Sequence, residues 1–275
     1  MSALSARSAW LLTLIALVAV AVTLYPLAWM VQLSLKTQVQ ALRMPPDFLF
    51  LPTLQGYWAA WSKAGFGPAL FNSLVVSLMA LTVGLVLGGL AAYAVSRYRF
   101  VGAQSLLFAM LVTRIFPPVA LILPFYLNLK AVGGHDTYWG LALAYVAMNV
   151  PLATWMLKGY FDAVPKELEE CAMIDGASRF TAVRKVTLPL MAPGIVATAI
   201  FAFIVSWNDF LFALILTSRN ARTLPVVIAE FVGDTGVDWP EVMAASVTAL
   251  APILAATFLL QKHIAQGLTA GAVKG

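Results

Sequence analysis

Six long apolar runs divide this sequence, and they decide what the chain can fold into. They cover approximately residues 9–33, 69–94, 104–127, 138–157, 192–217 and 243–262. Each run has about 20–26 residues with few or no charges, the length at which a helix crosses the hydrocarbon core of a bilayer. The runs are continuous rather than alternating, so they favour helices over the strands of a barrel. We therefore expect an all-α, polytopic membrane fold with six transmembrane helices, forming one domain over residues 1–275.

The composition excludes most other classes of protein. The chain has 275 residues, of which 61% are apolar and 11% are charged, whereas about 25% of a soluble domain is charged. An ordinary soluble enzyme and a disordered chain are both excluded on these grounds. The net charge of +5 indicates a charge bias of the loops beside a lipid bilayer, and not nucleic acid as a partner. The single cysteine allows neither an intrachain disulfide nor a cysteine-based zinc site.

The first apolar run predicts an uncleaved helix. Arg7 precedes it, and Ala19-Val20-Ala21 fits the pattern of a signal-peptide cleavage site, so a cleavable signal peptide is the alternative. The apolar stretch continues past that site to about Leu33, which is longer than the roughly 7–15 apolar residues of a signal peptide.

The placement of lysine and arginine predicts the orientation. If the N-terminus faces the cytoplasm, ten basic residues lie inside and six lie outside. The inside residues are Arg7, Arg97, Arg99, Lys158, Lys166, Arg179, Arg184, Lys185, Lys262 and Lys274, and the outside residues are Lys36, Arg43, Lys63, Lys130, Arg219 and Arg222. This bias has the expected sign for cytoplasmic loops, and six spans then place both termini in the cytoplasm.

The second run carries small residues at Ala80, Gly84, Gly88 and Ala92. This four-residue spacing makes a smooth stripe against which another helix packs closely. A subunit contact or moving interface and a static contact within the chain are equally compatible with the stripe.

Polar residues concentrate in one cytoplasmic loop, residues 159–190. The pattern predicts two short helices. The first starts near Pro165, has three acidic residues in its positive N-terminal turn and ends before Gly176. The second is capped by Ser178 and limited by Pro189. Both helices carry apolar residues, at Leu168, Cys171, Ala172 and Ile174 and at Phe180, Val183 and Val186. Such a hairpin docks onto another protein or lies on the membrane surface.

The spacing within this loop matches a known motif. Glu170-Cys171-Ala172 is followed by three residues and Gly176, then by nine residues and Val186-Thr187-Leu188-Pro189. This resembles the EAA motif of ABC importer permeases, which reads E-A-A, three residues, G, nine residues, I-x-L-P. Cys171 and Val186 are the departures, and both are small changes on an apolar face.

Further segments resemble the carbohydrate importers of the maltose type, and in particular the shorter, six-helix permease of the pair. These segments are Arg114-Ile115-Phe116-Pro117-Pro118, Asp136-Thr137-Tyr138-Trp139-Gly140, Trp207-Asn208-Asp209-Phe210 and residues 267–275. The resemblance implies a permease subunit of a sugar importer in a bacterial or archaeal cytoplasmic membrane. Its implied partners are a second permease subunit, two ATP-binding cassette subunits and an extracytoplasmic sugar-binding protein.

The resemblance also implies that the loop is a coupling helix held in a cleft of an ATPase subunit. Glu170 and Asp175 would meet polar or basic groups there, Cys171 and Ala172 would allow close approach, and Gly176 would turn the chain. The coupling set is completed by Arg179, Phe180, Leu188 and Pro189. The cytoplasmic tail, residues 263–275, would reach between the ATPase subunits from about Gln266 onward, although plain disorder fits it equally well.

ATP chemistry is absent from the sequence itself. No G-x-x-x-x-G-K-[ST] motif occurs, so the chain has no phosphate cradle. His135 and His263 are isolated, and no nucleophile–base pair is evident. We therefore expect no catalytic residue, metal or cofactor in this chain, with ATP and Mg bound by the partner subunits.

Polar residues within the spans are the candidates for the substrate path. Arg114 lies beside Pro117 and Pro118, which leave backbone carbonyls without their usual donors, and both groups suit sugar hydroxyls. The alternative is a kinked helix with Arg114 paired to an internal carboxylate. The other candidates are Asn149, Trp207, Asn208 and Asp209.

Two other functions compete with an ATP-driven permease. An autonomous secondary transporter or channel needs carboxylates for coupling ions within the spans, and Asp209 is the only one there. A membrane enzyme needs a catalytic constellation, which the sequence does not contain.

Overall fold

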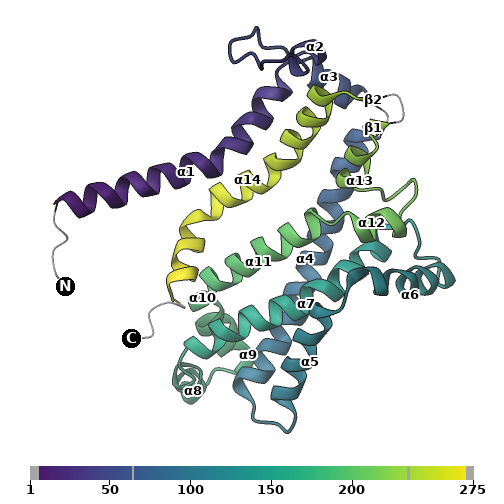
Figure 1. The fold of residues 1–275 in the computed structure, drawn as a ribbon. Coiled ribbons are helices and arrows are strands. Elements are labelled where there is room, and N and C mark those ends of the chain that lie inside the picture. Colours follow the sequence, from purple (N-terminus) through teal and green to yellow (C-terminus); the bar gives the residue numbers. More distant parts are fainter. Residues whose placement is uncertain (1–5, 64, 234–235, 271–275) are drawn as a thin grey trace. The chain divides into compact units, whose positions relative to one another are not determined.

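The computed structural model describes residues 6–63, 65–233 and 236–270, and it describes side chains in these ranges except at residues 6–9, 233 and 262–270. The elements in chain order are α1 (Ala6–Ser34), α2 (Gln38–Ala41), α3 (Gln55–Ser62), α4 (Phe66–Arg97), α5 (Ala103–Ile115), α6 (Pro118–Ala131), α7 (Tyr138–Ala163), α8 (Glu167–Ile174), α9 (Arg179–Ala182), η1 (Val183–Thr187), α10 (Leu188–Leu190), α11 (Ala192–Trp207), α12 (Leu211–Leu216), α13 (Leu224–Ala229), β1 (Val232–Gly233), β2 (Gly236–Val237) and α14 (Trp239–Ala270) (Figure 1). The expectation for the tail beyond Gln266 lies outside the described side chains and stays a prediction.

The all-α membrane fold is confirmed. Four helices, α1, α4, α7 and α14, are long and apolar enough to cross a bilayer. Two bent pairs of helices pass the same test: α5 with α6, and the segment Arg179–Leu190 with α11. The described part of the chain therefore has up to six spans. The chain is therefore a multi-pass membrane protein.

Two runs that looked like single helices are broken. In the third run, α5 and α6 meet at an angle of 96°. Pro117 and Pro118 lie at this break. They cause it, because two successive prolines remove two backbone donors and their rings clash with the preceding turn. In the fifth run, α11 ends at Trp207 and α12 begins at Leu211.

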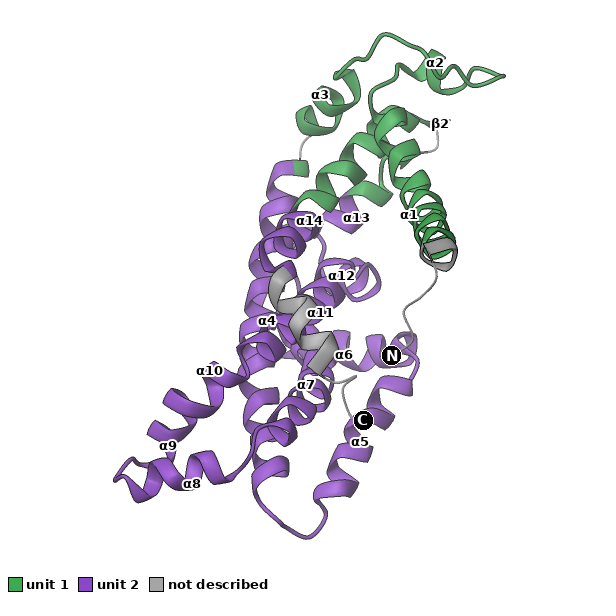
Figure 2. Ribbon diagram, turned by 90° about the vertical axis from the view of Figure 1, so that its left-hand side faces the viewer, with its two compact units in different colours: residues 1–66, 228–251 green, residues 67–227, 252–275 purple. Residues whose placement is uncertain are grey.

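The chain forms two compact units (Figure 2). One unit comprises residues 1–66 and 228–251. Its buried cation is Lys36, whose Nζ donates to the Asp47 carbonyl at 2.7 Å and lies 4.8 Å from the ring centroid of Phe50. The side chain of Gln38 joins distant segments of this unit, since it donates to the Val237 carbonyl and accepts from the Trp239 N–H.

The other unit comprises residues 67–227 and 252–275, and α4 and α7 pack closely within it. A Cβ atom added at Gly84 would lie 2.9 Å from Cβ of Asn149, and one added at Gly88 would lie 2.6 Å from Cβ of Ala153. Of the two interpretations of the small-residue stripe, the structure therefore shows a contact within the chain.

The loop after α12 is held by a single carboxylate. Asp136 accepts backbone N–H bonds from four successive residues, 218–221, at 2.9–3.1 Å. Partial burial opposes ionisation of Asp136, but these backbone bonds outweigh it and hold the pKa of the carboxyl well below its usual value. The first turns of α4 hold the same loop, because Asn72 donates to the Asn220 and Arg222 carbonyls. We call residues 217–224 the tethered loop.

We predict that Gly88→Ala destabilises the α4–α7 contact while Gly89→Ala does not. The new Cβ at position 88 would meet Ala153 at 2.6 Å and the backbone nitrogen of Thr154 at 3.1 Å, whereas the nearest atom at position 89 is 3.7 Å away. Overpacking costs about 1–3 kcal/mol. Thermal unfolding of the detergent-purified protein should show a lower Tm for Gly88→Ala only, and equal Tm values for both variants would contradict this packing.

We predict that the tethered loop keeps its tie to Asp136 in mild acid. A depressed pKa in the folded state means that the stabilisation is complete above about pH 4 and is lost only as the pH falls towards the folded-state value. Asp136→Asn should lower the hydrogen-exchange protection of amides 218–221 by roughly tenfold or more, because bonds to a charged acceptor contribute about 1.5–3 kcal/mol. Protection that is unchanged in the variant would rule out this role.

Candidate functional site

Residues 165–190 form the predicted helical hairpin, and its caps follow the sequence. The first turn of α8 contains the acidic residues Glu167, Glu169 and Glu170. Gly176 has φ of 89°, the left-handed conformation that glycine adopts without strain, and it stands just beyond the C-cap Asp175. Ser178 caps α9 by accepting the N–H of Thr181.

The second arm of the hairpin is longer than expected. Pro189 was expected to limit it, but the chain stays helical through η1 and α10 to Leu190. The reason is a π-helical turn at Val183–Thr187, after which the N–H of Leu188 bonds to the carbonyl of Val183. Pro189 follows at a position near the start of α10, where a missing N–H costs little. We call residues 165–190 the coupling hairpin.

In the coupling hairpin, two large apolar side chains face outward and one charged side chain faces inward. Ile174 is 84% exposed and Phe180 is 74% exposed, whereas Glu169 is buried. The residues matching the motif lie on the open side: Glu170, Cys171, Asp175, Gly176, Arg179, Phe180, Leu188 and Pro189 are exposed, and Ala172 is partly buried. The side available for a partner therefore combines carboxylates with large apolar side chains.

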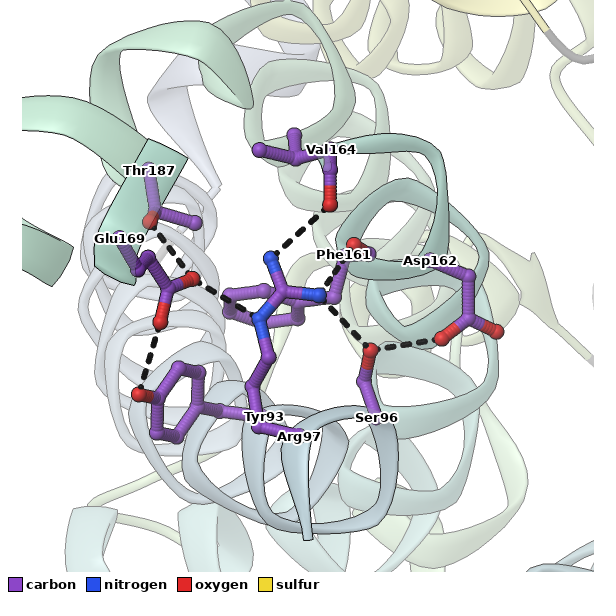
Figure 3. A network of polar contacts seen from close by, with 8 residues as sticks. All are labelled: Tyr93, Ser96, Arg97, Phe161, Asp162, Val164, Glu169 and Thr187. Carbon is purple, nitrogen blue, oxygen red and sulfur yellow. Dashed lines mark hydrogen bonds and ion pairs between the residues drawn. The ribbon is translucent and has the colours of Figure 1, made fainter. Parts of the chain in front are cut away.

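A buried ion pair holds the base of the coupling hairpin (Figure 3). Nε of Arg97, at the end of α4, donates to Oε1 of Glu169 at 2.8 Å, and the two side chains are only 4% and 5% exposed. The other guanidinium nitrogens donate to the carbonyls of Phe161 and Val164 at 3.0 and 3.1 Å. Since carbonyls at a helix end lack partners within the helix, Arg97 also caps the end of α7.

Two hydroxyl groups complete the shell around Glu169. Thr187 in η1 donates to Oε1 at 2.8 Å, and Tyr93 in α4 donates to Oε2 at 3.1 Å. Burial opposes ionisation of Glu169, but the bonds from Thr187 and Arg97 outweigh it and keep the pKa of this carboxyl below its usual value. Glu169 is therefore charged at neutral pH.

Two further contacts lie beside the ion pair. Oγ of Ser96 donates to Asp162 at 2.6 Å, and Asp162 is paired with Lys158 one turn earlier in α7. The guanidinium of Arg179 lies 5.3 Å from the ring centroid of Tyr98. The end of α4 thus contacts both arms of the coupling hairpin.

The residues of this network were not predicted as a site. Arg97 follows the second apolar run and was counted only as a basic residue that marks the cytoplasmic side, and Glu169 only as an acid near a helix start. A usable signal was present, because Glu169 shares a helical face with Ala172 and Met173, three and four positions later. A charge on the face that packs inward requires a buried partner.

A cavity of about 690 Å³ lies within the membrane-spanning part of the unit formed by residues 67–227 and 252–275. Residues of α5, α6, α7 and α12 line it, and nearly all of them are apolar. Thr113 and Arg114 are the polar exceptions, and Arg114 lies at the C-terminal end of α5, where the helix dipole favours a cation. Its guanidinium donates to the Met148 carbonyl at 3.1 Å, and no ion pair joins it to a carboxylate among the described residues.

The other four candidates for the substrate path do not line this cavity. Asn149 is buried between helices and donates to Oγ of Ser206 at 2.8 Å. Trp207 is buried against Phe203, and their ring centroids are 5.4 Å apart. Asn208 is exposed and donates back to its own helix. Asp209 accepts the N–H groups of Phe212 and Ala213, so it caps α12.

Known proteins match this chain over most of its length. A family model described as the inner membrane component of binding-protein-dependent transport systems matches residues 84–270. The trehalose/maltose transport system permease protein MalG of Thermococcus litoralis is 38% identical over 264 residues, which cover 92% of each chain. The trehalose transport system permease protein SugB of Mycobacterium tuberculosis is 38% identical over 257 residues, covering 92% of this chain and 93% of SugB. The sulfoquinovosyl glycerol transport system permease protein SmoH of Agrobacterium fabrum is 35% identical, covering 92% and 89%.

A solved structure shares the fold. One chain of a bacterial ABC transporter involved in the import of the acidic polysaccharide alginate superposes with a TM-score of 0.74 at 21% identity, covering 96% of this chain and 99% of that one. The chain belongs to the family of binding-protein-dependent transport system inner membrane components, and it is a membrane permease subunit of an ABC importer whose ATPase activity lies in separate subunits.

Proposed function

We propose that this permease carries a carbohydrate, such as a disaccharide or oligosaccharide, through a path that it shares with a second permease subunit. Several relatives that match over about nine-tenths of the chain have names that specify trehalose, maltose or a sulfoquinovosyl glycerol as cargo. An extracytoplasmic binding protein delivers the sugar. The balance of basic residues, ten inside against six outside, supports a bacterial or archaeal cytoplasmic membrane with both termini in the cytoplasm.

The open side of the coupling hairpin is the observation that carries the ATP-driven mechanism. Ile174 and Phe180 are large apolar residues that project away from the chain, beside the exposed carboxylates of Glu170 and Asp175. A soluble partner with an apolar cleft and basic residues is complementary to this surface. Each of two ATPase subunits binds ATP and Mg and holds one such hairpin, from this chain and from the second permease.

Closure of the ATPase subunits on ATP then moves the hairpin, and the attached helices follow. The two arrangements of the permease differ in which side of the membrane reaches the path. Arg114 lines the cavity at the break between α5 and α6. Its free N–H donors and the unpaired carbonyls at the end of α5 suit the hydroxyl groups of a sugar. We keep Asn149, Trp207, Asn208 and Asp209 as candidates for the path outside this cavity.

The geometry disfavours an autonomous secondary transporter. Such a protein needs an intramembrane carboxylate that is available to a coupling ion. Asp209 is the carboxylate in question, and its Oδ1 accepts two backbone N–H bonds at 3.1 and 3.3 Å. It is therefore engaged in holding α12.

We predict that Gly176→Val strongly reduces ATP-driven uptake. Valine in the left-handed conformation costs about 1–2 kcal/mol or more, and it deforms the turn between the two arms. Membranes that contain the permease pair, the binding protein and the ATPase should accumulate radiolabelled trehalose or maltose, or diacetylchitobiose, which the name of a further relative, 32% identical, specifies. Omitting the ATPase should remove this uptake, and Gly176→Val should reduce it at least roughly tenfold.

Gly102→Val is the matched control for this experiment. Gly102 has φ of 91° with no atom near its Cβ position, so the same strain is introduced outside the hairpin. Uptake that persists without the ATPase would refute the proposed function. Normal uptake by Gly176→Val would refute docking through this turn.

We predict that Arg114→Ala impairs uptake of the same sugars while the complex stays assembled. The side chain is exposed to the cavity and makes one hydrogen bond, to the Met148 carbonyl at 3.1 Å, so its loss removes about 0.5–1.5 kcal/mol of stability at most. Arg114→Lys keeps the charge and should retain part of the activity. Loss of assembly in Arg114→Ala, measured by co-purification, would assign the residue a structural role instead.

A further inference from the structure

The guanidinium of Arg97 is shared by the elements that meet at the base of the coupling hairpin. It extends from the last residue of α4, pairs with Glu169 in α8 and caps the carbonyls of Phe161 and Val164 at the end of α7 (Figure 3). Thr187 in η1 joins through the same oxygen of Glu169. Both arms of the hairpin are therefore tied to α4 through one ion pair.

This ion pair also sets which face of α8 points outward. Successive residues of a helix are rotated by about 100°. Glu169 is held inward by three donors, and the next two residues, Glu170 and Cys171, are exposed as a consequence. The large apolar neighbours Leu168 and Ile174 are exposed as well. The apolar residues on the inward face, Ala172 and Met173, are only partly buried, so apolar burial contributes little to this orientation.

A buried ion pair is suited to orientation rather than to stability. Desolvation of the two charges offsets much of their attraction, and the established benefit of such pairs is that they specify one arrangement. Here both oxygens of Glu169 and all three nitrogens of Arg97 have partners. A rotated α8 would leave two buried charges without partners, and the network thus selects a single orientation.

We propose that Arg97 is the positioning residue of the coupling hairpin: its ion pair with Glu169 fixes α8 on α4, so that the docking face points at the ATPase and moves with α4. The inference rests on the proposed docking of the hairpin. It adds a residue outside the motif and 72 positions from its partner. At its other end α4 holds the tethered loop through Asn72 and Ser73. The helix α4 therefore connects the coupling hairpin with the tethered loop.

The test compares Arg97→Gln with Arg99→Gln in the assembled transporter. Both changes remove one positive charge from the same segment, and Arg99 is exposed. Three quantities are measured: the amount of ATPase that co-purifies, the rate of MgATP hydrolysis, and uptake of the sugar that the wild-type transporter accumulates fastest among trehalose, maltose and diacetylchitobiose. A fourth is the rate at which a maleimide labels Cys171, which is the one cysteine of the chain and is exposed in α8.

A positioning role affects these four quantities differently. For Arg97→Gln, the assembled complex should hydrolyse MgATP, but uptake per complex should fall roughly tenfold or more, and the labelling rate of Cys171 should change. Arg99→Gln should behave as the wild type in all four. Arg97→Lys, which keeps the charge, should recover part of the uptake.

Uptake per assembled complex that is unchanged in Arg97→Gln would overturn the proposal, because a merely structural residue changes only the amount of complex. If Arg97→Gln does not assemble, Glu169→Gln is judged by the same criteria, since it removes the charge and keeps the shape of the side chain. Failure of the docking itself is separate. It would appear as equal labelling of Cys171 in the wild-type permease with and without the ATPase subunits, whatever Arg97→Gln does.

Discussion

The charge of Arg97 must be satisfied away from water, and the arrangement of the elements around the coupling hairpin depends on this requirement. A guanidinium has five N–H donors in one plane. The chain supplies Glu169 and the carbonyls of Phe161 and Val164 at the end of α7, and each guanidinium nitrogen donates to one of these three groups. As a result, the end of α4, the end of α7 and both arms of the coupling hairpin are joined at one point. The exposed motif residues obtain their orientation from this buried contact.

The sequence was sufficient for features that depend on neighbouring residues. Long apolar runs predict spanning helices, and the fold confirms them. The hairpin was predictable for the same reason, because the turn at Gly176 and the cap at Ser178 are local requirements of the backbone. The EAA spacing pointed to the permease family, and the family match over residues 84–270 confirms it.

Features that depend on distant residues were not predictable in the same way. Arg97 and Glu169 are far apart in the chain, and only tertiary packing shows that they are partners. The polar residues near Trp207 illustrate the opposite case: their composition suits a sugar site, but Asp209 and Asn208 satisfy nearby backbone groups and Trp207 is buried. Pro189 failed as a limit because a π-helical turn shifted the hydrogen-bond register before it.

Two positions of α8 reverse the polarity of an ordinary surface helix, and this reversal is informative. A charged residue faces inward while Ile174 faces outward, 84% exposed. In an isolated chain the exposed apolar area is unfavourable, and the buried charge contributes little net stability. Both costs are reasonable if another subunit covers the outer face and if the inner pair keeps that face in one orientation. The two features therefore support each other: a helix that exposes its large apolar residues has little apolar packing to orient it, and the ion pair supplies the anchor.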